Sequence, residues 1–444
     1  MRKKLVFTET SIDDFSLSMV TNLSIVCDQY EIDLYLFVSN LKQELFWKKR
    51  GFNATSFKVD KVNNLQFPYE ITQHLRTLGK FDENLIDPLP SESAVTRKLK
   101  ELDPIFVLSF VGPEAFKHSI KSIANSMNIG SKFLDFCPIP GRMALVETCF
   151  SALNLKKVYE GILEPSVESQ ELFTKLKSMD RIASVRSDRK PESVGFLDTF
   201  RNKKADFLSR FRNIRSQPSL RQINSFSRQL TKTINYLLIK LFSWKLWRVF
   251  ISKSDKQRVV GFITFAMQTS TETAFSYGSR LFSTPEQAFL EYSKYFKLSE
   301  DILYRLHPMA ASLLSTSTIL KSFVGGNKVS CYESSSKEVF GLSKAIVVWN
   351  GNIGFEALLQ GKKVITLGNS YYSGLGLTYD IFTYQELREI NTYFEDEENS
   401  TYDLTRLVDS ILTVSFKGNI DKDGFDQVMQ EIISNCESSE NVSI

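Results

Sequence analysis

The stretch that decides the fold is residues 302–380, in which short β-forming segments alternate with helical ones. The β-forming segments are ILYR (302–305), KVSCY (328–332), KAIVVW (344–349) and KVITL (363–367), and the helical run NGNIGFEALL (350–359) separates the last two. This alternation is typical of a parallel sheet with crossover helices. Such sheets bind ligands at the carboxyl ends of their strands. We therefore expect His307 and the loop 350–354, each after a predicted strand, to converge on one crevice.

The same alternation extends through the rest of the 444 residues. Strands are predicted at 5–7, 32–38, 57–59, 104–111, 133–136 and 259–265, and helices at 13–30, 41–50, 91–102, 113–127 and 384–393. The chain from about Asn435 is polar and is predicted to fray. A chain of this length exceeds one ordinary core. We expect α/β architecture with a first domain over 1–195, a linker over 196–256 and a Rossmann-like domain over 257–444.

Composition limits the chemistry. The chain is 42% hydrophobic and 24% charged, which is ordinary for a globular protein. Its five cysteines are scattered and its histidines number three, so neither a disulfide framework nor a zinc site is expected. The acidic run 395–398 is interpreted as a solvated surface rather than a metal site. The first residues carry no apolar region long enough for a signal peptide, and no run is long enough to span a membrane. These features predict a cytoplasmic protein.

Residues 198–248 form a basic segment, with twelve Lys or Arg against two Asp. Its apolar residues recur at helical spacing, and three basic residues lie roughly opposite them: Arg221, Arg228 and Lys232. One interpretation is an amphipathic helix on an anionic membrane surface. The other is an interdomain helix that packs its apolar face on the protein. Nucleic-acid binding is not expected, because no nucleic-acid motif accompanies the charge.

Several motifs in order resemble the bacterial capsular polysaccharide biosynthesis family. They are FAMQTSTE (265–272), His307-Pro308, GFEALL (354–359), GKKVITLG (361–368) and GLGLT (374–378). That family includes Kdo transferases and related glycosyltransferases of the GT-B type, which use CMP-activated sugars. The resemblance implies two Rossmann-like domains that face a central cleft, joined here by the basic segment. It also implies that 1–195 serves the acceptor and 257–444 binds the nucleotide sugar.

The loop after the predicted strand 344–349 is suited to an anion. Backbone donors and the positive end of the following helix favour phosphate, so Asn350, Gly351, Asn352 and Gly354 are candidate nucleotide-binding residues. Glu356, one turn further, is placed to accept hydrogen bonds from ribose hydroxyls. The alternative is an ordinary strand-to-helix turn. Relatives commonly have Asn-Ser-Thr at 350–352, so this chain lacks two hydroxyls that they carry.

Three residues are predicted to be catalytic. The resemblance implies that His307 contacts the nucleotide phosphate beside Pro308, where a protonated imidazole would offset the charge on the departing CMP. Gln268 and Glu272 match the family's Gln-then-acid motif, and Glu272 is a candidate base or nucleophile. Asp135, after a predicted strand of the first domain, is a candidate base or nucleophile or else a structural capping acid.

These observations predict a cytoplasmic glycosyltransferase, peripheral to the inner face of the membrane, that needs no metal or other cofactor. It would move Kdo or a related acidic sugar from a CMP donor to a lipid-linked or glycan acceptor of a capsule or surface polysaccharide. One alternative is a UDP-sugar or CDP-polyol transferase of the same plan. Another is a catalytically silent homologue that binds glycan or assembly partners.

Overall fold

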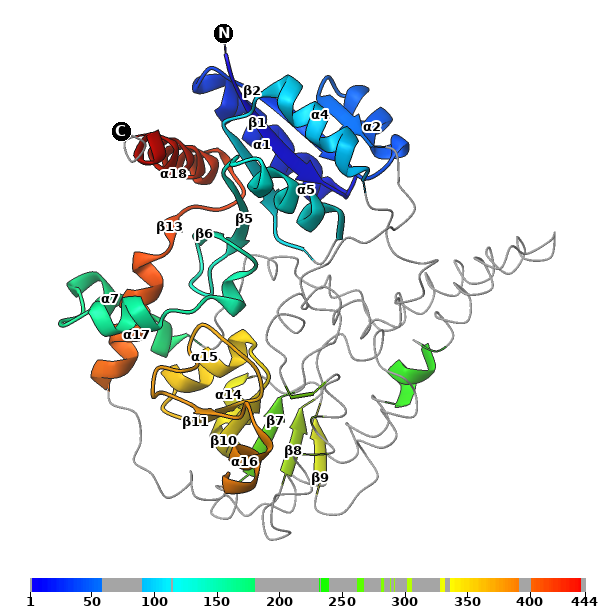
Figure 1. Ribbon diagram of the computed structural model, residues 1–444. Coiled ribbons are helices and arrows are strands. Elements are labelled where there is room, and N and C mark those ends of the chain that lie inside the picture. The colour runs from blue at the N-terminus through cyan, green and yellow to red at the C-terminus, as the bar shows by residue number, and fades with distance from the viewer. Residues whose placement is uncertain are drawn as a thin grey trace, which may run out of the picture.

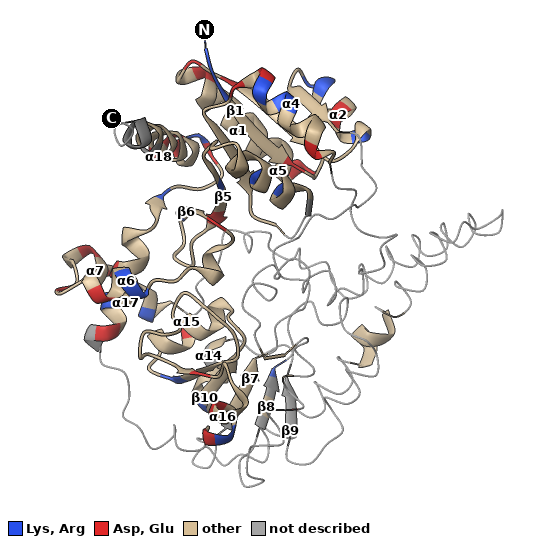
Figure 2. Cartoon of the chain, in the orientation of Figure 1, with Lys and Arg blue, Asp and Glu red and all other residues tan. Residues whose placement is uncertain are grey.

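The computed structural model describes two β-sheets, each covered by helices (Figure 1). The described residues are 2–57, 90–112, 115–179, 231, 233–238, 262–266, 281–282, 288, 291, 302–305, 328–331, 336–390 and 401–440. Both sheets are mainly parallel, which confirms the predicted α/β class with two Rossmann-like domains. Charged residues lie on helices such as α7 and α16, and strands carry them too, as at Lys3, Lys4 and Glu9 of β1 (Figure 2).

The first sheet has seven strands. In spatial order they are β13 (Phe416–Lys417), β6 (Arg142–Val146), β5 (Ser131–Phe136), β4 (Phe106–Phe110), β1 (Lys3–Glu9), β2 (Ile32–Val38) and β3 (Asn53–Ser56). The five from β5 to β3 are parallel, and β6 runs antiparallel to both of its neighbours, β5 and β13. Strand β4 is buried along its whole length, as expected for an apolar central strand between two helical layers.

Helices cover both faces of this sheet. One face carries α1 (Asp14–Gln29), α2 (Leu41–Lys48) and α18 (Lys422–Glu440), and the other carries α4 (Glu92–Leu102) and α5 (Ala115–Ser126). Helix α4 illustrates why: Val95, Leu99 and Leu102 recur at helical spacing and are all buried. The side chain of Asp13 caps α1 by accepting from Ser16 N.

The second sheet has six parallel strands. In spatial order they are β9 (Lys328–Cys331), β8 (Ile302–Arg305), β7 (Phe262–Ala266), β10 (Ser343–Val348), β11 (Lys363–Thr366) and β12 (Tyr379–Asp380). Helices α14 (Ser336–Leu342), α15 (Asn352–Leu359) and α16 (Tyr384–Glu389) accompany them. The order 3-2-1-4-5-6 is that of a doubly wound dinucleotide-binding sheet.

One apolar core joins the two sheets. It combines first-sheet residues such as Phe133 with second-sheet residues such as Val348. Three further helices contribute: α6 (Lys156–Gly161), α7 (Val167–Ser178) and α17 (Thr401–Thr413). The single-turn helix η1 (Phe150–Ala152) reaches the second domain through Phe150, whose ring centroid lies 5.4 Å from that of Tyr371.

The chain returns to the first sheet after residue 413, so the predicted extent 257–444 for the second domain is wrong at its end. Strand β13 pairs with β6, and α18 packs on α1. The Tyr30 hydroxyl donates to Asp426 Oδ1 over 2.8 Å, and Phe425 is buried in the first-sheet core. The sequence of an amphipathic helix such as α18 shows which of its faces is buried, but it does not show which of the two sheets that face packs on.

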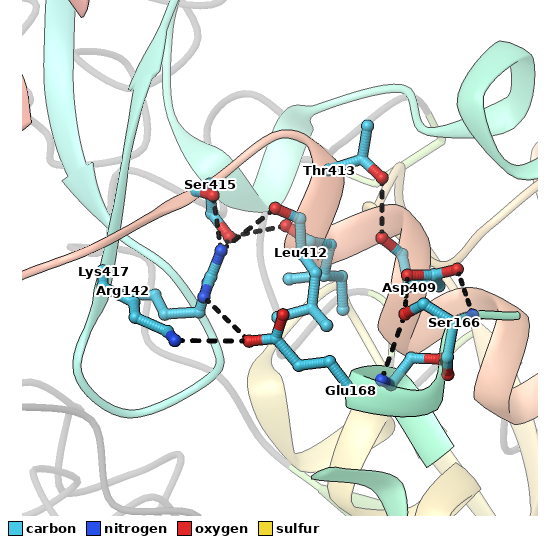
Figure 3. A network of polar contacts seen from close by, with 10 residues as sticks. Arg142, Ser166, Glu168, Asp409, Leu412, Thr413, Ser415 and Lys417 are labelled. Atoms are coloured by element: carbon cyan, nitrogen blue, oxygen red, sulfur yellow. Dashed lines mark hydrogen bonds and ion pairs between the residues drawn. The ribbon is translucent and has the colours of Figure 1, made fainter. Parts of the chain in front are cut away.

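Arg142 binds the segment after α17, where the chain begins to return to the first sheet (Figure 3). Its guanidinium donates to the Leu412 and Ser415 carbonyls, over 3.1 Å and 2.7 Å, and to Ser415 Oγ over 2.9 Å. These carbonyls lie at the carboxyl end of α17, where a cation is favoured. Nearby, Ser166 donates to both carboxylate oxygens of Asp409 on α17, from its backbone N and its Oγ.

Other boundaries differ from the predicted ones. Strand β3 at 53–56, where Ala54 and its neighbours pair with β2, was not predicted, and residues 58 and 59 of the strand expected at 57–59 lie outside the described residues. The chain from Asn435, predicted to fray, is helical as far as Glu440, where α18 ends. The basic segment 198–248 lies outside the described residues except for 231 and 233–238, which are helical. No helix in the described parts is both long enough and apolar enough to cross a membrane.

Candidate functional site

The second sheet has its topological switch point between β7 and β10. From β7 the chain continues to β8 and β9 on one side, and β10, β11 and β12 lie on the other. A crevice for ligands is expected beyond the carboxyl ends of the two central strands, at Ala266 and Val348. In the chain, Gln268 and Glu272 follow the first of these ends.

The described residues include only part of the predicted site. Gln268, Glu272, His307 and Pro308 lie outside them. The segment from Asn350 to Glu356 is described: it follows the end of β10, as predicted, and enters α15 at Asn352.

This loop leads straight into a helix. Asn350 is fully buried, and Gly351 is the N-cap of α15 with extended backbone angles, φ −78° and ψ 161°. A glycine offers no side-chain oxygen to cap the first turn, and none of the first-turn residues is acidic. The backbone N–H groups of the first helical turn carry the positive end of the helix dipole, and in α15 the one at Gly354 already donates to the Gly351 carbonyl oxygen over 3.0 Å. The arrangement can therefore receive an anion.

The glycine at 354 has a packing role that the sequence did not predict. Its assignment as a nucleotide-binding residue stays a prediction. A Cβ on Gly354 would lie 2.7 Å from Cζ of Tyr372, closer still to its hydroxyl oxygen, and 3.0 Å from Cγ2 of Val348. Gly354 is thus required because a buried tyrosine fills the space beside it.

Tyr371 and Tyr372 are site residues that the sequence reasoning missed. They follow β11 and are both fully buried. The sequence feature that could have identified them is their position just before the glycine motif 374–378, which was used only as evidence of the family resemblance. Burial raises the pKa of Tyr371 well above its ordinary value, and the nearby charges of Tyr372, Cys137 and Glu356 act in the same direction. Half-buried Glu356 therefore lies near Tyr371, and its predicted contact with ribose stays a prediction.

Asp380 accepts hydrogen bonds that hold the loop with the glycine motif 374–378. Its Oδ1 accepts from the hydroxyls of Thr366 and Thr378, each over 2.6 Å, and its Oδ2 accepts from Gly374 N over 2.6 Å. Gly374 and Gly376 have φ of 74° and 78°, values that favour glycine. Burial raises the pKa of Asp380, and these three hydrogen bonds oppose the rise. Asp380 thus has a structural position that the sequence reasoning did not identify.

Asp135 has structural contacts on both oxygens. Its Oδ1 accepts from Phe136 N over 2.8 Å and its Oδ2 from Phe150 N over 2.7 Å. These bonds tie the end of β5 to η1, the segment that reaches Tyr371. The contacts agree with the capping alternative for Asp135 and give no sign of the catalytic one.

In the described parts of the chain, no group of three or more His, Cys, Asp or Glu is arranged to hold a metal ion. Three of the described cysteines are buried, and burial is the main cause that raises the pKa of Cys27, Cys137 and Cys149 to about 12.

Comparison with known proteins gives one family match. Residues 190–404 match the family model described as capsule polysaccharide biosynthesis protein. This confirms the resemblance predicted from the motifs. The matched stretch contains β7 to β12, and hence the switch point with its glycine loop. Among curated protein sequences, none matches the chain.

Solved structures provide distant likenesses. The β-Kdo 2,7 transferase of Thermosulfurimonas dismutans KpsC is 13% identical, with 97% of this chain and 99% of that chain covered and a TM-score of 0.41. The β-Kdo 2,4 transferase of the same protein is 11% identical, with coverages of 69% and 79% and a TM-score of 0.38. MurG of Acinetobacter baumannii is 8% identical, with coverages of 97% and 99% and a TM-score of 0.34.

Proposed function

We propose that this protein is a GT-B glycosyltransferase of capsule or surface polysaccharide biosynthesis. It transfers Kdo or a related acidic sugar from a CMP-activated donor to a lipid-linked or glycan acceptor. The domain of the second sheet binds the donor, and the domain of the first sheet serves the acceptor. The observation that carries this proposal is the loop Asn350–Gly354 at the switch point of a 3-2-1-4-5-6 sheet, inside the stretch that matches the family model.

The loop supplies the chemistry that a nucleotide phosphate needs. The uncapped first turn of α15 presents backbone donors and a positive dipole end, so it can hold an anion without a metal. Glu356, one turn further along the same helix, accepts hydrogen bonds from the ribose. Its position on the helix that receives the phosphate keeps the two contacts at a fixed spacing.

In the chain, His307 follows the end of β8 by two residues, and β8 and β10 are the two strands that flank β7. We propose that it contacts the donor phosphate as an imidazolium and stabilises the charge that collects there as the glycosidic bond breaks. An interaction that strengthens in the transition state lowers turnover more than binding when it is lost. His307→Ala should therefore cut turnover about a hundredfold with a smaller loss of nucleotide affinity. Equal losses in both would oppose this role.

Peripheral association with an anionic membrane, at the inner face, belongs to the same proposal. The basic segment 198–248 carries a net +10. Within its described part, Ile234 and Leu237 from the predicted apolar face are 41% and 48% exposed. Exposed apolar residues next to a strong positive charge favour a lipid surface over packing on the protein. Reversing Arg221, Arg228 and Lys232 to Glu should abolish sedimentation with anionic liposomes, and retained binding would oppose this proposal.

A thermal-shift comparison of CMP, CDP, UDP and GDP tests the donor. A nucleotide at a hundred times its dissociation constant should stabilise the fold by about 2.7 kcal/mol. The proposal expects the largest shift with CMP. A larger shift with UDP or CDP would indicate a transferase with another donor, and no shift with any nucleotide would indicate a silent homologue.

A further inference from the structure

Two buried tyrosines contact the loop Asn350–Gly354. Tyr371 and Tyr372 come from the segment after β11, and their ring centroids are 4.9 Å apart. Each is 0% exposed, so neither is available to contact a ligand from solvent. A buried tyrosine hydroxyl needs a hydrogen-bond partner. Both hydroxyls find it in the loop.

Tyr372 holds the turn that begins α15. Its hydroxyl donates to the Gly351 carbonyl oxygen over 2.8 Å, and the same oxygen accepts from Gly354 N over 3.0 Å. One carbonyl therefore closes the turn and receives the tether. Gly354 has no Cβ at the point where that side chain would meet the phenol ring. The Tyr372 hydroxyl can therefore reach the Gly351 carbonyl only because Gly354 has no side chain.

Tyr371 connects the loop with the first domain. Its hydroxyl donates to Asn352 Oδ1 over 3.4 Å, and its ring packs edge-on against Phe355 of α15 at 5.9 Å. On its other side it meets Phe150 of η1. The loop is thus supported by residues from both domains, none of which is exposed.

We infer that Tyr372 is a positioning residue, which fixes the Gly351–Gly354 turn in its anion-receiving conformation before the donor arrives. The identity of the anion as a nucleotide phosphate rests on the proposed function. Because the hydrogen bond from Tyr372 already orders the loop in the folded protein, the loop loses little conformational entropy when the donor binds, and affinity is higher. Without the hydroxyl, the loop samples other conformations and the affinity for nucleotide falls.

Tyr372→Phe tests this with two readouts. The first is hydrogen exchange, by mass spectrometry and without nucleotide, in a peptide spanning 349–358. Loss of one net hydrogen bond should speed exchange there about fivefold. The second is the dissociation constant of CMP, measured by calorimetry, which should rise about threefold to tenfold. Tyr30→Phe is the matched control, because it removes a tyrosine hydrogen bond of 2.8 Å to Asp426, outside the loop and its supports.

The inference is supported if exchange and CMP affinity both change in Tyr372→Phe while its melting temperature stays close to that of Tyr30→Phe. Unchanged exchange at 349–358 overturns it, as does a uniform rise in exchange over the whole chain. Should Tyr372→Phe not fold, Tyr371→Phe removes the longer bond to Asn352 and should give a smaller change in the same peptide. If the wild-type protein binds no CMP, the proposed function fails, whereas the exchange result still decides the role of Tyr372.

Discussion

The Arg142 guanidinium on β6 donates to the Ser415 carbonyl oxygen over 2.7 Å, across 273 residues of chain. That bond lies where the chain leaves α17 and returns to the first sheet. The Arg142 side chain is only 12% exposed, so its three hydrogen bonds are largely shielded from water.

Arg142→Met should therefore destabilise the protein by about 2–4 kcal/mol, because it leaves buried carbonyls without a charged donor. Denaturant unfolding measures this. Lys417→Met is the matched control: its ion pair with Glu168 spans 3.6 Å between exposed side chains, and its loss should cost under about 0.5 kcal/mol. Equal costs in the two variants would contradict the assignment of Arg142.

Gly354→Ala should cost about 1–3 kcal/mol, since the new methyl group overlaps Tyr372. Gly341→Ala on α14 is the control, because its Cβ would meet nothing within 4 Å, and it should be neutral or slightly stabilising. In a double-mutant cycle, Tyr372→Phe should add less in the Gly354→Ala background than alone, because the alanine already displaces the ring. Strict additivity would show that the two residues are not coupled.

Asp135→Asn should lower the unfolding free energy by about 1–3 kcal/mol and leave turnover per folded molecule unchanged. The asparagine can accept from only one of the two backbone amides and turns a donor toward the other. Denaturant unfolding and an assay normalised to folded protein separate the effects. Lost turnover at an unchanged unfolding midpoint would instead restore the catalytic role expected from the sequence.

Asp380 predicts a pH dependence of stability. Burial raises the pKa of this carboxyl above its ordinary 3.8, so the folded state binds the proton more tightly than the unfolded chain does. The contribution of Asp380 to the unfolding free energy is therefore complete below pH 3.8, falls as the pH rises through the folded pKa, and is level above it. Denaturant titrations from about pH 3.5 to 7 should show the wild-type protein losing stability relative to Asp380→Asn across that window. A relative gain with rising pH would contradict the raised pKa.

Local pattern was sufficient for much of the fold. The run 344–349 is apolar and β-branched, and it became β10 at 343–348, with the glycine loop at its end. Tyr371 and Tyr372 could not be predicted in the same way, because their roles depend on contacts between distant residues. Tyr372 fills the space beside Gly354, 18 positions earlier, and Tyr371 packs on Phe150 of the first domain. The return of α18 to the first sheet depends on contacts such as Tyr30 with Asp426, which no local pattern encodes. Asp135 lay at the predicted strand end, but its partners Phe136 and Phe150 are backbone amides whose direction only the folded chain determines.

The most direct test of the central claim is a hydrogen-exchange footprint of CMP on the wild-type protein, compared with UDP at matched saturation. If the loop at the switch point holds the donor phosphate, CMP should slow exchange in the peptide 349–358 and leave α4 on the first sheet unchanged. Binding of CMP without protection of 349–358 would contradict the assigned site. Protection by UDP but not by CMP would contradict the assigned donor.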